Sequence, residues 1–275
     1  MKDFILVASS QDLAGTNLAS YLKSTLGFAP DGRHDGAEGQ SFSSSQHRAK
    51  LYVANASLLT LETLDLIFPD ARAFVFLSKH RSDSGIPTLT CHCTGNFSAD
   101  APFGGNPREV AIALPSLQKA YLRAITDAQV PGYEVIIEAT HHGPTSLKKP
   151  VLFVELGSSE KQWADGSAAK AMCDSLLGVL GDNNIDEPCK KVGVAIGGTH
   201  YPTKFNKLLL ESEFGLAAVA SKHALGAIDE AMLAQMIDKS AESVTHIVLD
   251  AKGLGSHKDR VIRMAENTGL EILKV

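Results

Sequence analysis

Short apolar runs alternate with amphipathic stretches along most of this chain. Runs rich in Val, Ile, Leu and Phe, bounded by polar or glycine-containing segments, are typical of buried β-strands. On this basis we predict strands over residues 4–8, 50–53, 73–77, 88–94, 133–139, 151–156, 192–196, 217–220 and 246–249.

Several stretches between these runs carry apolar residues at helical spacing. In the clearest one, Val110, Leu114, Leu117, Tyr121 and Ile125 fall on one face, and charged residues occupy another. We predict this helix and further helices over residues 13–26, 161–180, 203–211, 228–237 and 258–268.

Strand and helix alternate most regularly after residue 133, which indicates parallel strands joined by crossover helices. We therefore predict a single α/β domain over residues 1–275, with a mixed, largely parallel sheet flanked by helices. Residues 27–46 are rich in Gly, Ser, Asp and His, and we expect them to form a surface loop or insertion. In such sheets ligands bind beyond the carboxyl ends of the strands, where the polar clusters of this chain lie.

The composition is that of an ordinary globular protein. Of 275 residues, 44% are hydrophobic and 21% are charged, which suffices for a core without disulfide support. No apolar run approaches the ~20 residues of a membrane helix, and the first is too short for a signal peptide, so we expect a cytoplasmic protein. The net charge of −5 argues against a strongly basic nucleic-acid binder, although a local basic patch could still contact phosphates.

The most informative stretch is Glu138-Ala139-Thr140-His141-His142-Gly143-Pro144-Thr145, at the end of a predicted strand. A carboxylate and two adjacent imidazoles are ligands that zinc accepts, and a catalytic zinc site keeps one position for water. The metal lowers the pKa of that water toward about 7 and supplies hydroxide at neutral pH. The alternative is a pair of structural histidines that are merely hydrogen-bonded.

A second cluster, Gly197-Gly198-Thr199-His200-Tyr201-Pro202, follows the strand predicted over residues 192–196. The two glycines allow a tight turn, and Pro202 suits the first turn of the next helix. His200 is thus held near a helix N-terminus, unless this is an ordinary turn with a solvated histidine. No phosphate-binding loop and no dinucleotide fingerprint are present.

Shorter motifs add further candidates. Arg81, in His80-Arg81-Ser82, can hold a carboxylate or phosphate. Cys91-His92-Cys93 is not a thiolate site for one metal, because neighbouring strand residues point to opposite faces. Glu155-Leu156-Gly157-Ser158 offers Glu155 as a general base or as a partner of a metal ligand. Ser221-Lys222-His223 follows another strand.

One further motif is Thr90-Cys91-His92 with Gly95-Asn96, which contains the same histidine. With it, these six motifs, taken in order, resemble the archaeal-type D-aminoacyl-tRNA deacylase family, which also occurs in plants. The resemblance runs from the first strand to the last helix. It implies a zinc-dependent esterase that releases D-amino acids wrongly attached to tRNA. It also implies a fold similar to the nucleoside phosphorylase and peptidyl-tRNA hydrolase type.

We therefore predict one site built from separate loops. The expected partner is D-aminoacyl-tRNA as substrate, with no DNA and no membrane, and the expected state is a monomer or homodimer. The cofactor is Zn²⁺, held by a subset of His80, His92, Glu138, His141, His142, His200 and His223. Catalytic roles are expected for Glu155, Lys222 and Arg81, and substrate binding for Ser158, Gly197, Gly198, Thr199 and Tyr201.

Two other functions are compatible with the same motifs. One is a zinc amidohydrolase or peptidase that acts on a small substrate without tRNA. The other is a nucleoside phosphorylase-like, nucleotide-binding protein in which the histidines only form hydrogen bonds. A serine hydrolase is not supported, since no Gly-x-Ser-x-Gly motif occurs.

Overall fold

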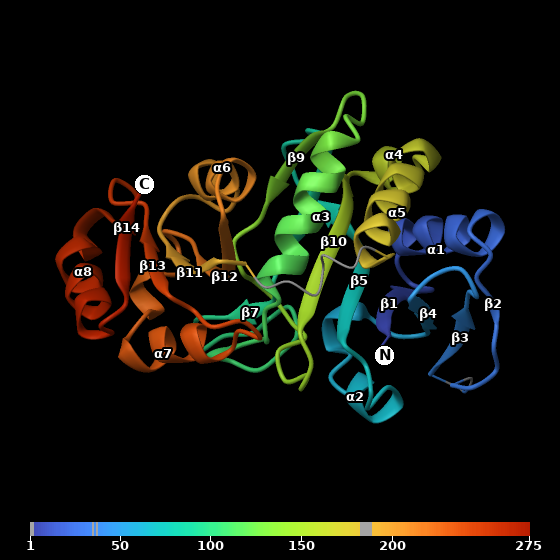
Figure 1. The fold of residues 1–275 in the computed structure, drawn as a ribbon, viewed down its shortest axis with the longest axis horizontal. Coiled ribbons are helices and arrows are strands. Elements are labelled where there is room, and N and C mark those ends of the chain that lie inside the picture. Colours follow the sequence, from blue (N-terminus) through green and yellow to red (C-terminus); the bar gives the residue numbers. More distant parts are fainter. Residues whose placement is uncertain (1–2, 35, 37, 182–188) are drawn as a thin grey trace.

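The computed structural model describes residues 3–34, 36, 38–181 and 189–275. Two sheets lie side by side along the long axis of the molecule, with helices packed against them (Figure 1). The architecture is mixed α/β and largely parallel, as predicted, but the strands form two main sheets where one was expected. The single domain over residues 1–275 stays a prediction.

The larger sheet has eight strands. Its central strands β4, β1, β5 and β10 are parallel, and β6 then pairs antiparallel with β10 and parallel with β9. Across the sheet the order is β2 (Ala29–Pro30), β3 (Gly39–Ser43), β4 (Ala49–Ala54), β1 (Phe4–Ser9), β5 (Ala73–Arg81), β10 (Val151–Ser158), β6 (Thr88–His92) and β9 (Glu134–Ile137).

The smaller sheet is entirely parallel. Its order is β12 (Phe214–Ala220), β11 (Lys191–Ile196), β13 (His246–Leu249) and β14 (Glu271–Lys274). A short antiparallel pair, β7 (Gly95–Asn96) and β8 (Glu109–Val110), is separate from both sheets.

Alternation along the strands divides the core into two layers. In β1, Phe4 and Leu6 belong to one buried cluster, and Ile5 and Val7 belong to the other. The first cluster includes residues of α1, α3 and α5, which contact one another in a row (Figure 1). The helices are α1 (Leu13–Thr25), α2 (Leu64–Ile67), α3 (Pro115–Asp127), α4 (Glu160–Trp163), α5 (Gly166–Gly181), α6 (Thr203–Glu211), α7 (Glu230–Asp238) and α8 (Lys258–Asn267), with 3-10 turns at Leu58–Thr60, Leu225–Ala227 and Gly255–His257.

The prediction of a loop over residues 27–46 is wrong in part, because β2 and β3 extend the larger sheet there. Phe42 is buried, and a Cβ on Gly39 would lie 2.6 Å from the Tyr52 side chain and the Val53 carbonyl oxygen. This strand carries a single large apolar residue, so its pattern gave little signal. Residues 35 and 37 lie outside the described residues.

Other elements differ in their bounds. The helix predicted over residues 161–180 is two helices, because Asp165 accepts backbone hydrogen bonds from Ser167 (2.8 Å) and Ala168 (3.2 Å) and so starts α5. Val110 lies in β8, and the helix begins at Pro115. Strand β14 was not predicted. None of the helices in the described residues is long and apolar enough to cross a bilayer.

Candidate active site

One face of the larger sheet carries the buried polar residues predicted from the sequence. In β10, Phe153 and Glu155 share this face by alternation, and in β5 Phe76 and His80 do the same. Because β6 runs antiparallel to β10, its last residue, His92, lies opposite Phe153. The site thus lies over the sheet face opposite α1, α3 and α5, where strands β5 and β6 arrive from opposite directions.

A segment after β9 crosses this face and joins the two sheets. The Ala139 amide donates to the His200 carbonyl (2.8 Å), and the Thr140 amide donates to the Val219 carbonyl of β12 (2.9 Å). The Gly95 amide then donates to the carbonyls of His141 (3.2 Å) and His142 (2.8 Å). His142 has φ of 46°, in the left-handed region that non-glycine residues rarely occupy. The backbone therefore holds both histidines in a defined position.

Beyond the histidines, the Glu62 carboxylate ties down the same segment. It accepts hydrogen bonds from the backbone amides of Thr145 (2.9 Å) and Ser146 (2.8 Å). The Glu109 carboxylate accepts hydrogen bonds from the side-chain hydroxyls of Thr145 and Ser146, both at 2.8 Å. The sequence analysis missed both carboxylates, since each lies far along the chain from the residues it holds.

Glu138 is the central carboxylate of the site. Its side chain is 1% exposed, and its Oε2 lies 2.7 Å from His200 Nε2 and 3.7 Å from His141 Nε2. Its Oε1 lies 3.1 Å from His80 Nδ1, in a geometry that is not a hydrogen bond. His80 also contacts Glu155 Oε2 at 3.4 Å, and its Nε2 pairs with the Tyr201 hydroxyl at 2.8 Å.

The charges in this cluster follow from burial and from these contacts. Burial lowers the pKa of His80, but Glu138 and Glu155 outweigh it and raise that pKa to about 11. Burial raises the pKa of Glu155, but His80 and His92 bring it to about 2. The pKa of Glu138 is likewise lowered, against burial, by His200 and His80. At neutral pH His80 is therefore an imidazolium between two carboxylates. Burial lowers the pKa of His92 as well, but Glu155 outweighs it and raises that pKa.

His141 and His142 are in the opposite electrostatic state. Burial, reinforced by His92, lowers the pKa of His142 to about 4 and holds the pKa of His141 well below its usual value. Both imidazoles are therefore neutral at pH 7, the form in which histidine binds a metal.

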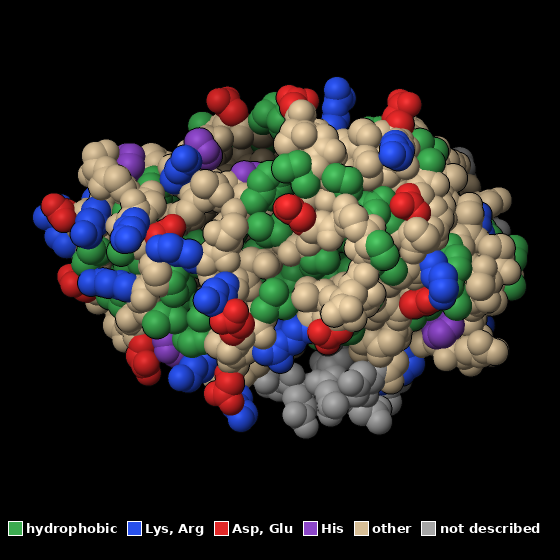
Figure 2. All heavy atoms as spheres, turned by 90° about the horizontal axis from the view of Figure 1, so that it is seen from above, with side chains coloured by type: hydrophobic (Ala, Val, Ile, Leu, Met, Phe, Trp, Pro, Cys, Tyr) green, Lys and Arg blue, Asp and Glu red, His purple; other side chains and the backbone are tan. Residues whose placement is uncertain are grey.

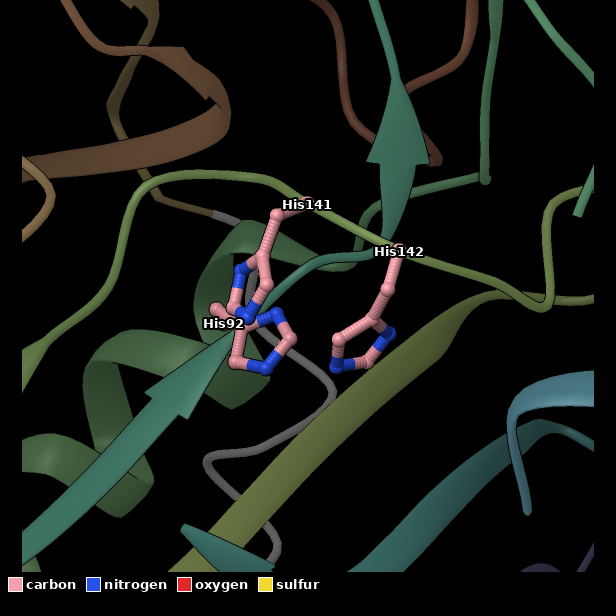
Figure 3. Close-up of side chains that lie close together, drawn as sticks. All are labelled: His92, His141 and His142. Atoms are coloured by element: carbon pink, nitrogen blue, oxygen red, sulfur yellow. The ribbon is translucent and has the colours of Figure 1, made fainter. Parts of the chain in front are cut away.

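Three imidazoles converge where β6 ends beneath the crossing segment (Figure 3). The ring of His141 lies 4.2 Å from that of His92 and 4.3 Å from that of His142, between ring centroids. In each residue Nδ1 lies near a backbone carbonyl: Cys93 for His92 (3.2 Å), Ala139 for His141 (2.8 Å) and Gly143 for His142 (2.7 Å). A proton on Nδ1 satisfies each carbonyl and directs Nε2 toward a metal, as in metal-binding histidines. At His92, whose pKa is raised, metal binding would release the Nε2 proton.

Three sets of side chains have ligand atoms within 4.8 Å of one another in the described residues. They are His92 with His141 and His142, Glu138 with His141 and His200, and His80 with Glu138 and Glu155. In the first set, His92 Nε2 is buried and has no hydrogen-bond partner among the described residues. The third set contains the protonated His80, which has no free lone pair for a metal.

A cavity of about 630 Å³ opens above these residues. Its wall includes Glu138, His141, His142, Glu155, His80 and His200. Lys79, Arg81 and Asp83 contribute from the end of β5 and the residues after it, and Leu59 and Phe103 from two loops. Asp12, which caps α1 through the Gly15 amide (2.8 Å), also reaches the cavity.

The remaining predicted residues are less closely associated with the cluster. Tyr201 joins it through His80, and Arg81 lines the cavity. Gly198 and Thr199 line a separate hollow of about 110 Å³ beside Asp250, and Gly197 is part of the same turn. Ser158 is buried, and its hydroxyl donates to the Ile86 carbonyl.

Lys222 and His223 are exposed, and neither belongs to a ligand set or lines the cavity among the described residues. The structure thus does not bring them into the predicted site. The Lys222 amide donates to the Gly198 carbonyl (2.8 Å), so their turn is held beside the Gly197–Gly198 turn.

Known proteins are similar to this chain in sequence and in fold. A family model described as D-aminoacyl-tRNA deacylase matches residues 67–273. A D-aminoacyl-tRNA deacylase of Cenarchaeum symbiosum is 38% identical over 272 residues, covering 98% of each chain. One of Methanocaldococcus jannaschii is 33% identical over 280 residues, again covering 98% of each.

Among solved structures, the crystal structure of a conserved protein of unknown function superposes with a TM-score of 0.89 and 28% identity. The match covers 99% of this chain and 95% of the other. Together with the ordered histidine and glutamate cluster, the matches confirm the resemblance carried by the six motifs. The chain belongs to the D-aminoacyl-tRNA deacylase family of hydrolases.

Proposed function

We propose that this protein hydrolyses the ester bond of D-aminoacyl-tRNA, releasing the free D-amino acid and tRNA, with a zinc ion held by His92, His141 and His142. Family membership supports the reaction. One observation supports the zinc site: three imidazoles gather with each Nδ1 at a backbone carbonyl, so that the three Nε2 atoms are available to a metal.

The chemistry of this set fits zinc. Imidazole nitrogen is a preferred zinc ligand, and three protein ligands leave a position for water. A buried polar atom without a partner, such as His92 Nε2, costs free energy unless something occupies it. Bound there, zinc would supply a hydroxide at neutral pH.

Glu138 and His200 are suited to move the proton of the leaving group. The buried carboxylate of Glu138 holds His200 Nε2 at 2.7 Å, in the way a carboxylate orients the histidine of a hydrolytic triad. The His200 side chain is 40% exposed, and it lies on the cavity wall. Its Nδ1 can accept the proton that the attacking water gives up and pass it to the ribose oxygen as the ester bond breaks.

Glu155 and His80 then serve to position and to balance charge. A pKa of about 2 makes Glu155 a poor proton acceptor at neutral pH, so its role is to hold His80 and to face His92 at 3.7 Å. The imidazolium of His80 offsets the charge of one of the two carboxylates. The cavity can then admit an ester carbonyl without strong repulsion of its oxygen.

The mixture of charges on the surface suits a tRNA that is held mainly by its aminoacylated end. Acidic and basic side chains are interspersed on the face shown in Figure 2, with no broad area of one sign. The contacts to tRNA are therefore expected at the cavity mouth, where Lys79 and Arg81 lie. With a tRNA substrate we expect a cytoplasmic protein, and its state as a monomer or homodimer stays a prediction.

The test compares D- and L-aminoacyl-tRNA as substrates, with and without a chelator, and measures the zinc content of the same samples. We expect rapid release of the D-amino acid only, abolished by the chelator and restored by zinc. Equal rates on both enantiomers, or full activity on a small amide or peptide without tRNA, would favour the alternative hydrolases.

A substitution pair assigns the ligands. His142→Ala should lose bound zinc and lower turnover at least 100-fold, the scale of a lost ligand. His223→Ala should keep its zinc, because this side chain lies outside the ligand sets in the described residues. Normal zinc content in His142→Ala would remove the proposed zinc site.

A further inference from the structure

Phe103 is an aromatic side chain exposed at the wall of the cavity. It is 65% exposed, whereas the other large hydrophobic side chains exposed in the described residues, Leu13, Leu66 and Ile86, are aliphatic. The cavity that Phe103 lines also contains His141 and His142. An exposed aromatic ring gains nothing from the core, so its position beside the reacting centre calls for another explanation.

The backbone around Phe103 is rigidly held. The Gly143 amide donates to the Phe103 carbonyl (3.1 Å), and Asn96 Nδ2 donates to the Gly104 carbonyl (2.8 Å). Gly104 has φ of 78°, and a Cβ there would lie 2.0 Å from the Leu59 carbonyl oxygen. A Cβ on Gly143 would lie 2.3 Å from the Gly105 nitrogen. This backbone is therefore packed directly against the segment that carries the histidines.

Recognition of a base by stacking requires an aromatic ring whose face is exposed and whose backbone is held in place. Single-stranded ends of RNA are held by stacking their bases on aromatic side chains, because every base presents an apolar face. A ring that is already in place loses little conformational entropy on binding. Phe103 thus offers a stacking surface at a fixed distance from the imidazole cluster.

Two cations at the same cavity suit the phosphates that accompany such a base. Lys79 and Arg81 are both exposed, and both line the cavity. They alternate with His80 along β5, so both side chains leave the strand on the face opposite to that imidazole, two residues apart, and line the cavity near the end of the strand. The Lys79 ammonium lies 5.5 Å from the centre of the Trp163 ring, which fixes its direction.

We propose that Phe103 stacks on the 3′-terminal adenine of the tRNA, while Lys79 and Arg81 contact the adjoining phosphates. This subsite rests on the proposed function, since it presents the terminal ribose ester to the imidazole cluster. Because the ester is attached to the same nucleotide as the adenine, stacking of the base places the ester carbonyl in the cavity.

The experiment measures binding without the reaction. The probes are 5′-AMP and ribose 5-phosphate, which differ only in the base, titrated into the wild type and into Phe103→Ala. We expect the wild type to bind 5′-AMP roughly tenfold more tightly than ribose 5-phosphate, the order of a base–aromatic stack. Phe103→Ala should remove this difference, and Phe103→Trp should keep it.

Controls separate this subsite from a general effect on the fold. Leu66→Ala removes a side chain that is 82% exposed and lies outside the cavity lining, so its affinities should match those of the wild type. In turnover of D-aminoacyl-tRNA, Phe103→Ala should raise KM about tenfold and leave kcat nearly unchanged.

Equal affinity of the wild type for the two probes, or an equal loss of both in Phe103→Ala, would overturn the subsite while leaving the deacylase activity intact. Absence of turnover on every D-aminoacyl-tRNA, with the base preference still present, would instead reject the proposed function alone.

Discussion

At the scale of single residues, the site combines opposite protonation states within a few ångströms. His80 is held as an imidazolium between Glu138 and Glu155, whereas burial keeps His141 and His142 neutral. The difference arises from the partners: His80 faces two carboxylates at 3.1 and 3.4 Å, and His142 bonds to a backbone carbonyl at 2.7 Å. The imidazoles thus differ in charge, and the two neutral ones belong to the proposed zinc site.

This arrangement predicts how the metal-free protein responds to acid. The pKa of His142 is lowered from 6.5 to about 4 in the folded state, so between these pH values the unfolded chain binds a proton that the folded chain does not. His142 therefore contributes roughly 3 kcal/mol to the free energy of unfolding above pH 6.5. This contribution is lost as the pH falls toward 4. The stabilisation from His80, whose pKa is raised, is fully present below pH 6.5, so it stays constant over this range.

Urea unfolding of the chelator-treated protein between pH 7 and pH 4.5 measures this loss. In His142→Asn the decline should be clearly shallower than in the wild type, because one titrating imidazole is gone. The measured range stops at pH 4.5, the usual pKa of a glutamate. Glu155, whose folded pKa is about 2, changes the free energy of unfolding mainly below that pH. Parallel declines in the two proteins would refute the neutral assignment of His142.

At the scale of elements, close backbone contacts set the position of the functional side chains. Strands β5 and β10 are joined in register with Gly157 beside His80. A Cβ on Gly157 would lie 2.1 Å from the His80 carbonyl oxygen, which also accepts the Trp163 indole N–H at 2.8 Å. Only glycine fits between the strand and this indole.

Gly157→Ala should therefore lower the free energy of unfolding by about 1–3 kcal/mol and reduce deacylase activity, because the added methyl group must push the His80 backbone aside. Gly178→Ala is the matched control. Gly178 lies within α5, and a Cβ there meets nothing within 4 Å, so this change should stabilise the protein by about 0.5–1 kcal/mol.

Denaturant unfolding and turnover measurements on Gly157→Ala and Gly178→Ala test this prediction. Unchanged stability and activity in Gly157→Ala would show that β5 and β10 are not as tightly apposed as the structure has them.

At the scale of the whole molecule, the site is assembled between two sheets. The larger sheet supplies His80, His92 and Glu155, and the turn after β11 in the smaller sheet supplies His200. The segment after β9 joins them by bonding to the His200 and Val219 carbonyls. Substrate binding is then directed to one cavity on a chain of net charge −5.

The charge balance predicts a weak dependence of tRNA binding on salt. Each phosphate neutralised on a single strand contributes a slope of about −0.7 to log K against log salt. With Lys79 and Arg81 as the cations at the cavity, we expect a slope of about −1 to −3 for tRNA that carries no amino acid. Filter binding or fluorescence anisotropy at KCl concentrations of about 50 to 300 mM measures this slope. A slope steeper than about −6 would reveal an extended basic surface.

Much of the fold follows from local pattern. The apolar runs of β1, β10 and β11 lie close to their predicted bounds, because a buried strand must be apolar on both faces. Strand β3 was missed, because pairing with β4 and a glycine contact against Tyr52 stabilise it in place of apolar content. That Val110 belongs to β8 also depends on its partner Gly95, far away in sequence.

The sequence by itself determined which chemistry is available: neighbouring imidazoles and carboxylates at the ends of apolar strands, and the family to which they belong. Only the tertiary structure decided which of them meet. It brings Glu138 to His200, 62 residues away, and His80 to Tyr201, 121 residues away, and it leaves His223 exposed. The reason is physical: periodicity records which face of an element is buried, whereas these contacts depend on how the two sheets pack and on the antiparallel direction of β6.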